Sequence, residues 1–169
     1  PFFIYGQSLS PERIAKIKSA TVKVLAGPMM GTGFFIDKKG TLATCWHVVL
    51  PALQANMKIL IAFNNKDTVE MLVPSKLLQI GKEAYDAVGY DFCILVPKIS
   101  FTKNISFLKI GNFDKALEGQ EVYTCGYPIN YPFQFISKGI ISTKFMDDSN
   151  GIKSNNIFTS MPRQQALLD

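Results

Sequence analysis

The chain has 169 residues, the length of one domain or of two small subdomains that share an interface. Hydrophobic residues make up 47% of the sequence and charged residues 18%, a balance that argues against disorder because enough apolar surface exists to offset the entropy lost on folding. The net charge is +5, but the basic residues are scattered, whereas a nucleic-acid-binding face needs a cluster. No apolar run approaches the roughly 18 residues needed to cross a bilayer. We therefore expect a globular protein without a membrane span or a nucleic-acid partner.

Three cysteines, Cys45, Cys93 and Cys125, form an odd set without a Cys-x-x-Cys spacing, and the chain holds one histidine. These numbers argue against a structural zinc site and against a disulfide-rich scaffold. Cys45 and Cys93 lie within apolar segments, so we expect the thiols to be reduced and mostly buried. The sequence begins at Pro1 without a signal-like segment, and we infer no cellular compartment from this beginning.

Taken in chain order, the first expected element is a short helix, in which Ser10 can cap and Pro11 can occupy the first turn. Strands bounded by Gly, Pro, Asn and Asp are expected in the rest of the chain. Short strands joined by frequent turns favour a barrel or sandwich over alternating strands and helices. The expected strands cover residues 21–26, 33–36, 41–45, 58–63, 69–73, 77–80, 92–96, 121–125, 135–143 and 156–159.

The most informative segment is residues 31–49, with the sequence GTGFFIDKKGTLATCWHVV. It reads as an apolar strand, a polar turn ending in Gly40, a second apolar strand, and then His47, so we expect a hairpin about residues 37–40. A strand end on a rigid scaffold can hold a side chain toward a cleft, which makes His47 a candidate catalytic group. Taken alone, a histidine beside Trp46 is more often a structural residue.

This segment resembles the trypsin-like (chymotrypsin-fold) serine peptidases, most closely the HtrA/Deg-type bacterial branch, in its glycine pair, hairpin and His-Val-Val terminus. Two more segments are similar to that family in the same order: YDFCILV at residues 90–96, and GYP followed by SKGIIS at residues 126–142. The resemblance covers most of residues 21–159. It implies an all-β fold, a trypsin-like double β-barrel with a short N-terminal helix, whose second barrel is incomplete in this chain.

The resemblance also implies how the chain is divided. Residues 1–20 would form an N-terminal extension with the short helix, and residues 21–100 the first barrel. Residues 101–119, which overlap the least apolar-patterned connection at residues 99–117, would link the barrels. Residues 120–169 would then form the first part of the second barrel.

The candidate catalytic residues that the resemblance implies are His47, as general base, and Asp91, as the group that orients it. A serine hydroxyl needs a base within hydrogen-bond distance, and that imidazole needs an acceptor on its other nitrogen. The two residues are far apart in the chain, so only the tertiary fold can join them, and we expect a carboxylate oxygen of Asp91 near an imidazole nitrogen. Asp86 is the competing carboxylate, although no apolar strand follows it directly.

The family's third motif, Gly-x-Ser-Gly-Gly, supplies the nucleophile and the oxyanion hole, and it is absent from this sequence. Ser160 lies near the expected place, but Met161-Pro162 replaces the sharp glycine turn. Cys125 would suggest a cysteine peptidase, yet it lies near the start of the second barrel rather than at its nucleophile loop. We therefore expect the serine to lie outside this chain or to be lost, and residues 1–169 alone to be inactive.

Two functions remain open at this point. The first is a serine endopeptidase domain that hydrolyses peptide bonds through an acyl-enzyme; the alternative is a catalytically inactive protease-like module that binds protein segments. Either would take a protein or peptide partner. No cofactor or metal is expected, because proton transfer and an oxyanion hole suffice. Cleavage specificity, oligomeric state and the choice between cytoplasm and periplasm are not indicated.

Overall fold

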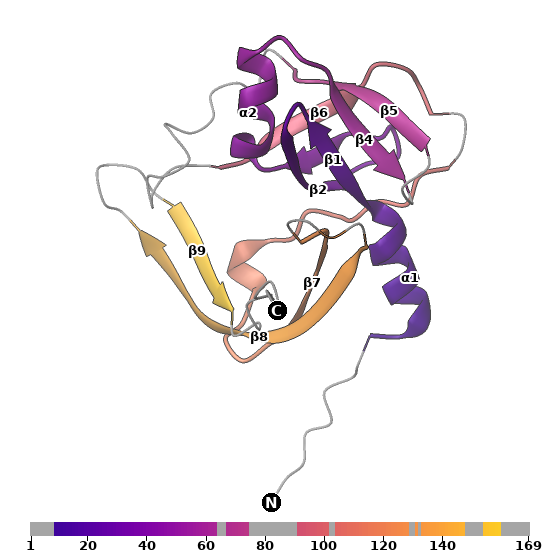
Figure 1. Cartoon of the computed structure of the whole chain (residues 1–169). Coiled ribbons are helices and arrows are strands. Elements are labelled where there is room, and N and C mark those ends of the chain that lie inside the picture. The colour runs from indigo at the N-terminus through magenta and orange to yellow at the C-terminus, as the bar shows by residue number, and fades with distance from the viewer. Residues whose placement is uncertain are drawn as a thin grey trace, which may run out of the picture.

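The computed structural model of the chain describes residues 9–63, 67–74, 91–101, 104–128, 131, 133–147 and 154–159. Strands dominate, as predicted, and they form two units: a closed barrel in the order β1-β2-β3-β6-β5-β4, and a three-stranded sheet in the order β7-β8-β9 (Figure 1). Within the described part of the chain, neither helix is long and apolar enough to cross a membrane.

β1 and β4 stand at the two ends of the strand order, and the barrel closes because β1 pairs antiparallel with β4 as well as with β2. The predicted strands of this half are confirmed to within a few residues, apart from the one at 77–80, which lies outside the described residues. The bounds are β1 Thr21–Ala26, β2 Met29–Phe35, β3 Leu42–Thr44, β4 Ile59–Phe63, β5 Asp67–Leu72 and β6 Cys93–Pro97.

The core of the barrel is filled by inward-facing apolar side chains from all the described strands that enclose it. Phe35 forms an aromatic cluster with Phe63 and Phe101, in which ring centroids lie 5.6 to 5.8 Å apart. Full burial of one large apolar side chain contributes about 1.5 to 3 kcal/mol, so the barrel holds much of the stabilising surface. The largest fully buried side chains are Phe35, Leu42, Ile61, Leu95, Val22, Val24, Val49 and Cys93.

The predicted hairpin is confirmed, since β2 and β3 pair with Phe34 opposite Ala43. Its turn is organised by Asp37, whose Oδ1 accepts hydrogen bonds from the backbone N–H groups of Lys39 and Thr41, at 2.8 and 3.1 Å. Gly40 follows with a φ of +88°, a conformation that glycine adopts without steric cost. The polar turn residues thus set the hairpin locally.

Helix α2, Trp46–Gln54, follows β3 directly and was not predicted. Its Val-Val pair and internal Pro51 favour a strand or a break by local propensity. The helix forms because Val48, Val49 and Ala52 are buried against the barrel. Tertiary packing therefore overrides the local signal.

The glycine pair of the Gly-Thr-Gly segment makes this packing possible. A Cβ atom at Gly31 would lie 2.7 Å from Cγ2 of Val48, and one at Gly33 would lie 2.4 Å from Cδ2 of Leu42. Any side chain at these positions would push α2 or β3 away from β2. Gly31 thus allows the helix that carries His47 to approach β2 closely, and Gly33 leaves room for Leu42 in the barrel core.

The second unit consists of β7 Glu121–Gly126, β8 Phe135–Asp147 and β9 Ser154–Thr159, with β8 in the middle. All three predicted strands are confirmed, each of them longer than expected. The described residues form an open sheet rather than a closed barrel, in agreement with the expected incomplete second barrel. The strands of the two units fall within the ranges 21–100 and 120–169 that we propose for the two halves.

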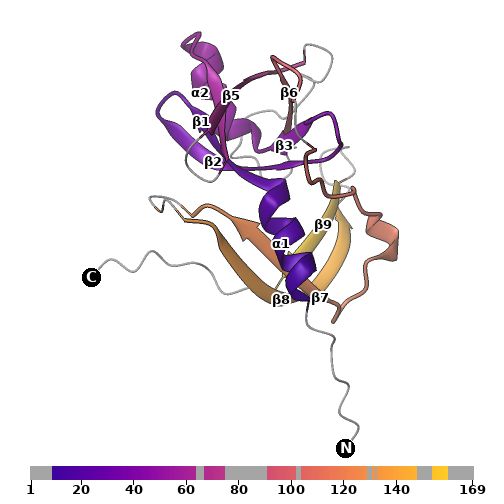
Figure 2. The ribbon, with the colours of Figure 1, turned by 90° about the vertical axis from the view of Figure 1, so that its right-hand side faces the viewer.

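Helix α1, Pro11–Ala20, runs from the barrel along the three-stranded sheet (Figures 1 and 2). Its predicted cap is confirmed, because Ser10 Oγ accepts from the N–H of Arg13 at 3.4 Å. The side-chain amide of Gln134 donates to the carbonyls of Lys18 and Thr21, at 2.9 and 3.1 Å. These contacts join the helix and the start of β1 to the second unit.

The connection between the units contains the 3-10 turn η2, Phe113–Lys115. The ammonium group of Lys144, in β8, donates to the carbonyls of Phe113, Asp114 and Ala116 at 2.9 to 3.3 Å. The carbonyl of Phe113 also accepts from the N–H of Ala116 within the turn, so the single cation adds to the pairing that the turn itself makes. The linker is thus held against β8.

Candidate active site

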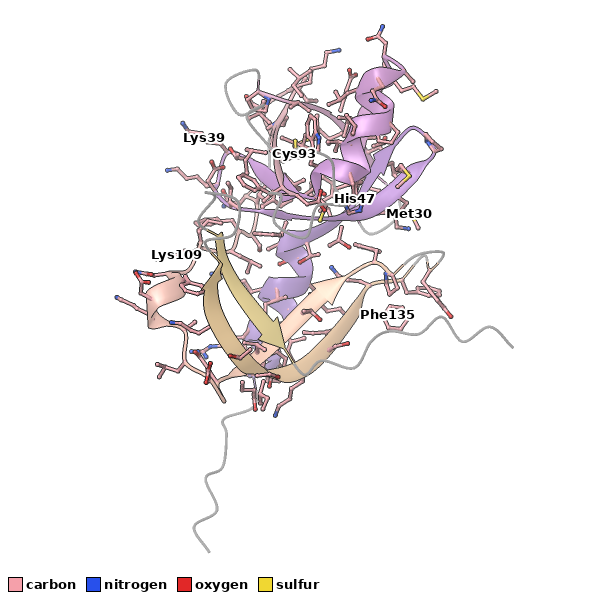
Figure 3. The ribbon with its side chains drawn as sticks, turned by 90° about the vertical axis from the view of Figure 1, so that its left-hand side faces the viewer. Met30, Lys39, His47, Cys93, Lys109 and Phe135 are labelled. Atoms are coloured by element: carbon pink, nitrogen blue, oxygen red, sulfur yellow. The ribbon has the colours of Figure 1, made fainter. Side chains whose placement is uncertain are left out.

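His47 lies in the first turn of α2, two residues after the N-cap residue Cys45. β3 ends at Thr44, so the chain turns from strand to helix immediately before the histidine. Figure 3 shows His47 at the edge of the barrel that is turned toward the three-stranded sheet. Its side chain is 47% exposed, which leaves the ring accessible from solvent.

The structure brings Asp91 to His47, although 44 residues separate them in the chain. His47 Nδ1 lies 2.5 Å from Asp91 Oδ2, and the backbone N–H of His47 donates to Asp91 Oδ1 at 2.9 Å. One carboxylate thus contacts both the ring and the backbone of the same residue. The expected approach of the two side chains is found.

The pairing of β3 with β6 explains this approach. Thr44 is opposite Cys93 in the antiparallel ladder, so the residues that follow Thr44 run beside the residues that precede Cys93. Asp91 therefore lies beside the start of α2. The register of β3 and β6 thus brings the segments that carry the two residues together.

Asp91 also replaces a cap that α2 lacks. Cys45 makes no side-chain cap hydrogen bond, and the first N–H groups of a helix have no partner within the helix. The carboxylate of Asp91 accepts one of them, and a negative charge at a helix N-terminus is stabilising by roughly 0.3 to 1 kcal/mol. Helix and carboxylate therefore hold each other in place.

This geometry determines which nitrogen of His47 is available for chemistry. A carboxylate only accepts hydrogen bonds, so Nδ1 is the nitrogen that donates to Asp91. The neutral imidazole then carries its lone pair on Nε2. The site can accept a proton at Nε2 while Asp91 stabilises the resulting imidazolium.

The prediction for Cys45 is wrong: its thiol is exposed, whereas Cys93 is buried and Cys125 is partly buried. The strand was expected to include Cys45, but β3 ends at Thr44. Cys45 lies instead at the open start of α2. Partial desolvation raises the pKa of the Cys45 thiol, and the negative charge of Asp91 and a hydrogen bond to it act in the same direction. The thiol stays protonated at neutral pH and is a weak nucleophile.

The other sequence candidates divide into two groups. Asp86 and Ser160 lie outside the described residues. Cys125 lies in β7 and contributes to an open pocket of about 230 Å³ that Thr32 and Tyr127 also line. Sequence reasoning missed the place of Cys45 beside His47 and Asp91.

The trypsin-like peptidase domain family matches residues 31–163 of the chain. Among solved structures, Deg5 superposes with a TM-score of 0.64 and 18% identity, over 91% of this chain and 76% of its own. The HtrA-type protease AlgW with decapeptide gives 0.61 and 16%, over 88% of this chain and half of its own. No curated protein matches the sequence. At these identities the two structures show the fold.

Proposed function

The chain belongs to the trypsin-like peptidase domain family, and from that premise we propose that it acts as the catalytic domain of a serine endopeptidase. The observation that carries the proposal is the contact between His47 Nδ1 and Asp91 Oδ2 at 2.5 Å, on a ring whose other nitrogen is available. The substrate class is peptide, in keeping with the decapeptide named with AlgW. We propose the same substrate class, peptides and proteins, for the whole protein.

In the proposed reaction, His47 is the general base and Asp91 is the positioning residue. Nε2 takes the proton of a serine hydroxyl as its oxygen attacks the peptide carbonyl, and then delivers that proton to the leaving amine. A water molecule, activated by His47 in the same way, then attacks the acyl-enzyme and releases the acyl group. Asp91 holds the tautomer and stabilises the imidazolium through both steps.

The proposal places the serine outside the 169 residues. None of the serines in the sequence has the Gly-x-Ser-Gly neighbours that expose a nucleophile and aim backbone N–H groups at the oxyanion. The pair described above supplies the base and its orientation. The nucleophile and oxyanion hole are then contributed by further residues of the protein.

The test uses the protein expressed from its own gene, with a fluorophosphonate probe and a fluorogenic peptide library. We expect labelling of one serine, cleavage by the wild type, and a fall in kcat/KM of roughly 10⁶-fold for His47→Ala and roughly 10⁴-fold for Asp91→Asn. Asp114→Asn, which changes an exposed carboxylate in η2, is the matched control and should keep the wild-type rate.

Two outcomes would contradict the proposal. Cleavage that survives His47→Ala would remove the base from the mechanism. A folded protein that neither reacts with the probe nor cleaves any peptide, but binds peptides reversibly, would establish the alternative, an inactive binding module.

A further inference from the structure

A third metal-binding side chain lies beside the proposed catalytic pair. One donor atom each from Cys45, His47 and Asp91 lie within 4.8 Å of one another. Zn²⁺ binds this combination of sulfur, imidazole nitrogen and carboxylate oxygen, whereas Mg²⁺ and Ca²⁺ prefer oxygen alone. We propose that Cys45, His47 and Asp91 form a Zn²⁺ site whose occupancy turns the peptidase off.

The three donors belong to residues that lie next to the pairing of β3 with β6. Cys45 is the N-cap residue of α2 and His47 lies in its first turn, while Asp91 lies two residues before β6, next to the pairing of Thr44 with Cys93. The barrel therefore holds the three side chains together before any ion arrives. Such preorganisation lowers the cost of assembling a metal site.

The distances are close to those that an ion requires. Ligands lie about 2.0 to 2.3 Å from Zn²⁺, which places neighbouring donors about 3 to 4 Å apart in a tetrahedral site. The Nδ1–Oδ2 distance of 2.5 Å must open, and the wider separations, which reach at most 4.8 Å, must close. Side-chain rotations can make both changes, because the side chains of His47 and Asp91 are 47% and 31% exposed.

Access and coordination number also suit a reversible site. Cys45 is exposed and the His47 side chain is 47% exposed, so an ion can enter from solvent. Three protein ligands leave a fourth position for water, and structural zinc sites use four. Such an open coordination position is typical of exchangeable rather than structural zinc.

The inhibitory effect follows from the tautomer of His47, and this step rests on the proposed function. Zn²⁺ bound to Nδ1 takes the place of the proton that now bridges to Asp91, and the neutral ring then carries its proton on Nε2. The Cys45 thiol releases its proton to solvent and becomes a thiolate ligand. A protonated Nε2 cannot accept the proton of a serine hydroxyl, so catalysis stops.

Binding is tested first, without reference to activity. The reduced protein is titrated with Co²⁺, whose thiolate charge-transfer absorption reports a sulfur ligand, and the bound Co²⁺ is then displaced with Zn²⁺. We expect a 1:1 complex, loss of the absorption band in Cys45→Ser, and Zn²⁺ affinity lowered at least about tenfold in His47→Ala and Asp91→Asn. Cys125→Ser is the matched control, because it removes a thiol of the second sheet, and it should keep the band.

Inhibition is tested second, on the peptidase from the native gene. Zn²⁺ should lower the cleavage rate of the wild type, a chelator should restore it, and Cys45→Ser should need at least about tenfold more Zn²⁺ for the same fractional inhibition of its own zinc-free rate. The inference is overturned if no 1:1 complex forms, or if Cys45→Ser and Cys125→Ser lose the band equally. An inactive protein that still binds Co²⁺ through Cys45 would contradict the proposed function and retain the metal site.

Discussion

The six-stranded barrel and the three-stranded sheet use the same antiparallel pairing, but they differ in how much surface each buries. Every barrel strand has a partner on both edges, whereas β7 and β9 each pair on one edge within the described residues. Leu42 and Leu95 of the barrel are fully buried. Among the described side chains of the sheet, Ile141 is the buried hydrophobic residue, and its neighbour Ile140 is 45% exposed.

This difference locates the rigid part of the candidate site. Both His47 and Asp91 belong to the closed unit, and the strand pair that positions them is surrounded by the core. The sheet meets the barrel through individual contacts, such as the hydrogen bond from the N–H of Tyr127 to Thr32 Oγ1. The geometry of the pair is therefore expected to depend on the barrel, and the three predictions below test this contrast.

The largest effect is expected from truncation of a core residue in the barrel. Leu42→Ala should lower the free energy of unfolding by about 2 to 5 kcal/mol, because it leaves a cavity among fully buried neighbours, whereas Ile141→Ala should cost no more than about 2 kcal/mol. Urea unfolding followed by the emission of Trp46, the single tryptophan, reports the barrel directly. Equal costs would show that the sheet is packed as tightly as the barrel.

A second effect is expected at alkaline pH from the buried thiol of the barrel. Burial raises the pKa of Cys93 to about 11 from its ordinary value of 9.0. The Cys93 thiol ionises more readily in the unfolded state than in the native state. Its contribution to the free energy of unfolding is therefore intact below pH 9. It falls by about 1 to 3 kcal/mol as the pH rises from 9 through 11.

The measurement compares urea unfolding at pH 8 and at about pH 11. Cys93→Ala should show a smaller loss between the two pH values than the wild type. Cys125→Ala is the counterpart in the sheet, where the thiol is only partly buried and the same cause raises its pKa. Cys125→Ala should lose nearly as much unfolding free energy between the two pH values as the wild type. If Cys125→Ala reduced this loss more than Cys93→Ala, the thiol with the more strongly raised pKa would be the one in the sheet.

The smallest effect is expected at the contact between the two units. Thr32 Oγ1 accepts from the backbone N–H of Tyr127 at 2.8 Å, and Thr32→Val removes this acceptor while keeping the shape of the side chain. The expected cost is about 0.5 to 1.5 kcal/mol, with faster hydrogen exchange at the Tyr127 amide. Thr68→Val, at an exposed position of β5, should change neither quantity. Unchanged exchange in Thr32→Val would mean that other contacts hold the units together.

Most strands could be predicted because their signals are local. β1 was expected at the residues where it is found, and the turn between β2 and β3 is specified by Asp37 and Gly40. Helix α2 could not be predicted, because its Val48 and Val49 favour a strand until the barrel offers them a surface to pack against. The exposure of Cys45 follows from that helix, so the same cause accounts for both errors.

The amino-acid sequence by itself determined the elements whose cause lies within a few residues, the Ser10 cap and the hairpin, and its family resemblance marked the glycine pair and the candidate histidine. Only the tertiary structure decided which groups surround His47. Asp91 becomes its neighbour because β3 pairs with β6 in one register, although the two residues are 44 positions apart in the chain. Local propensity carries no information about that register, since the free energy that selects it comes from burying the barrel core.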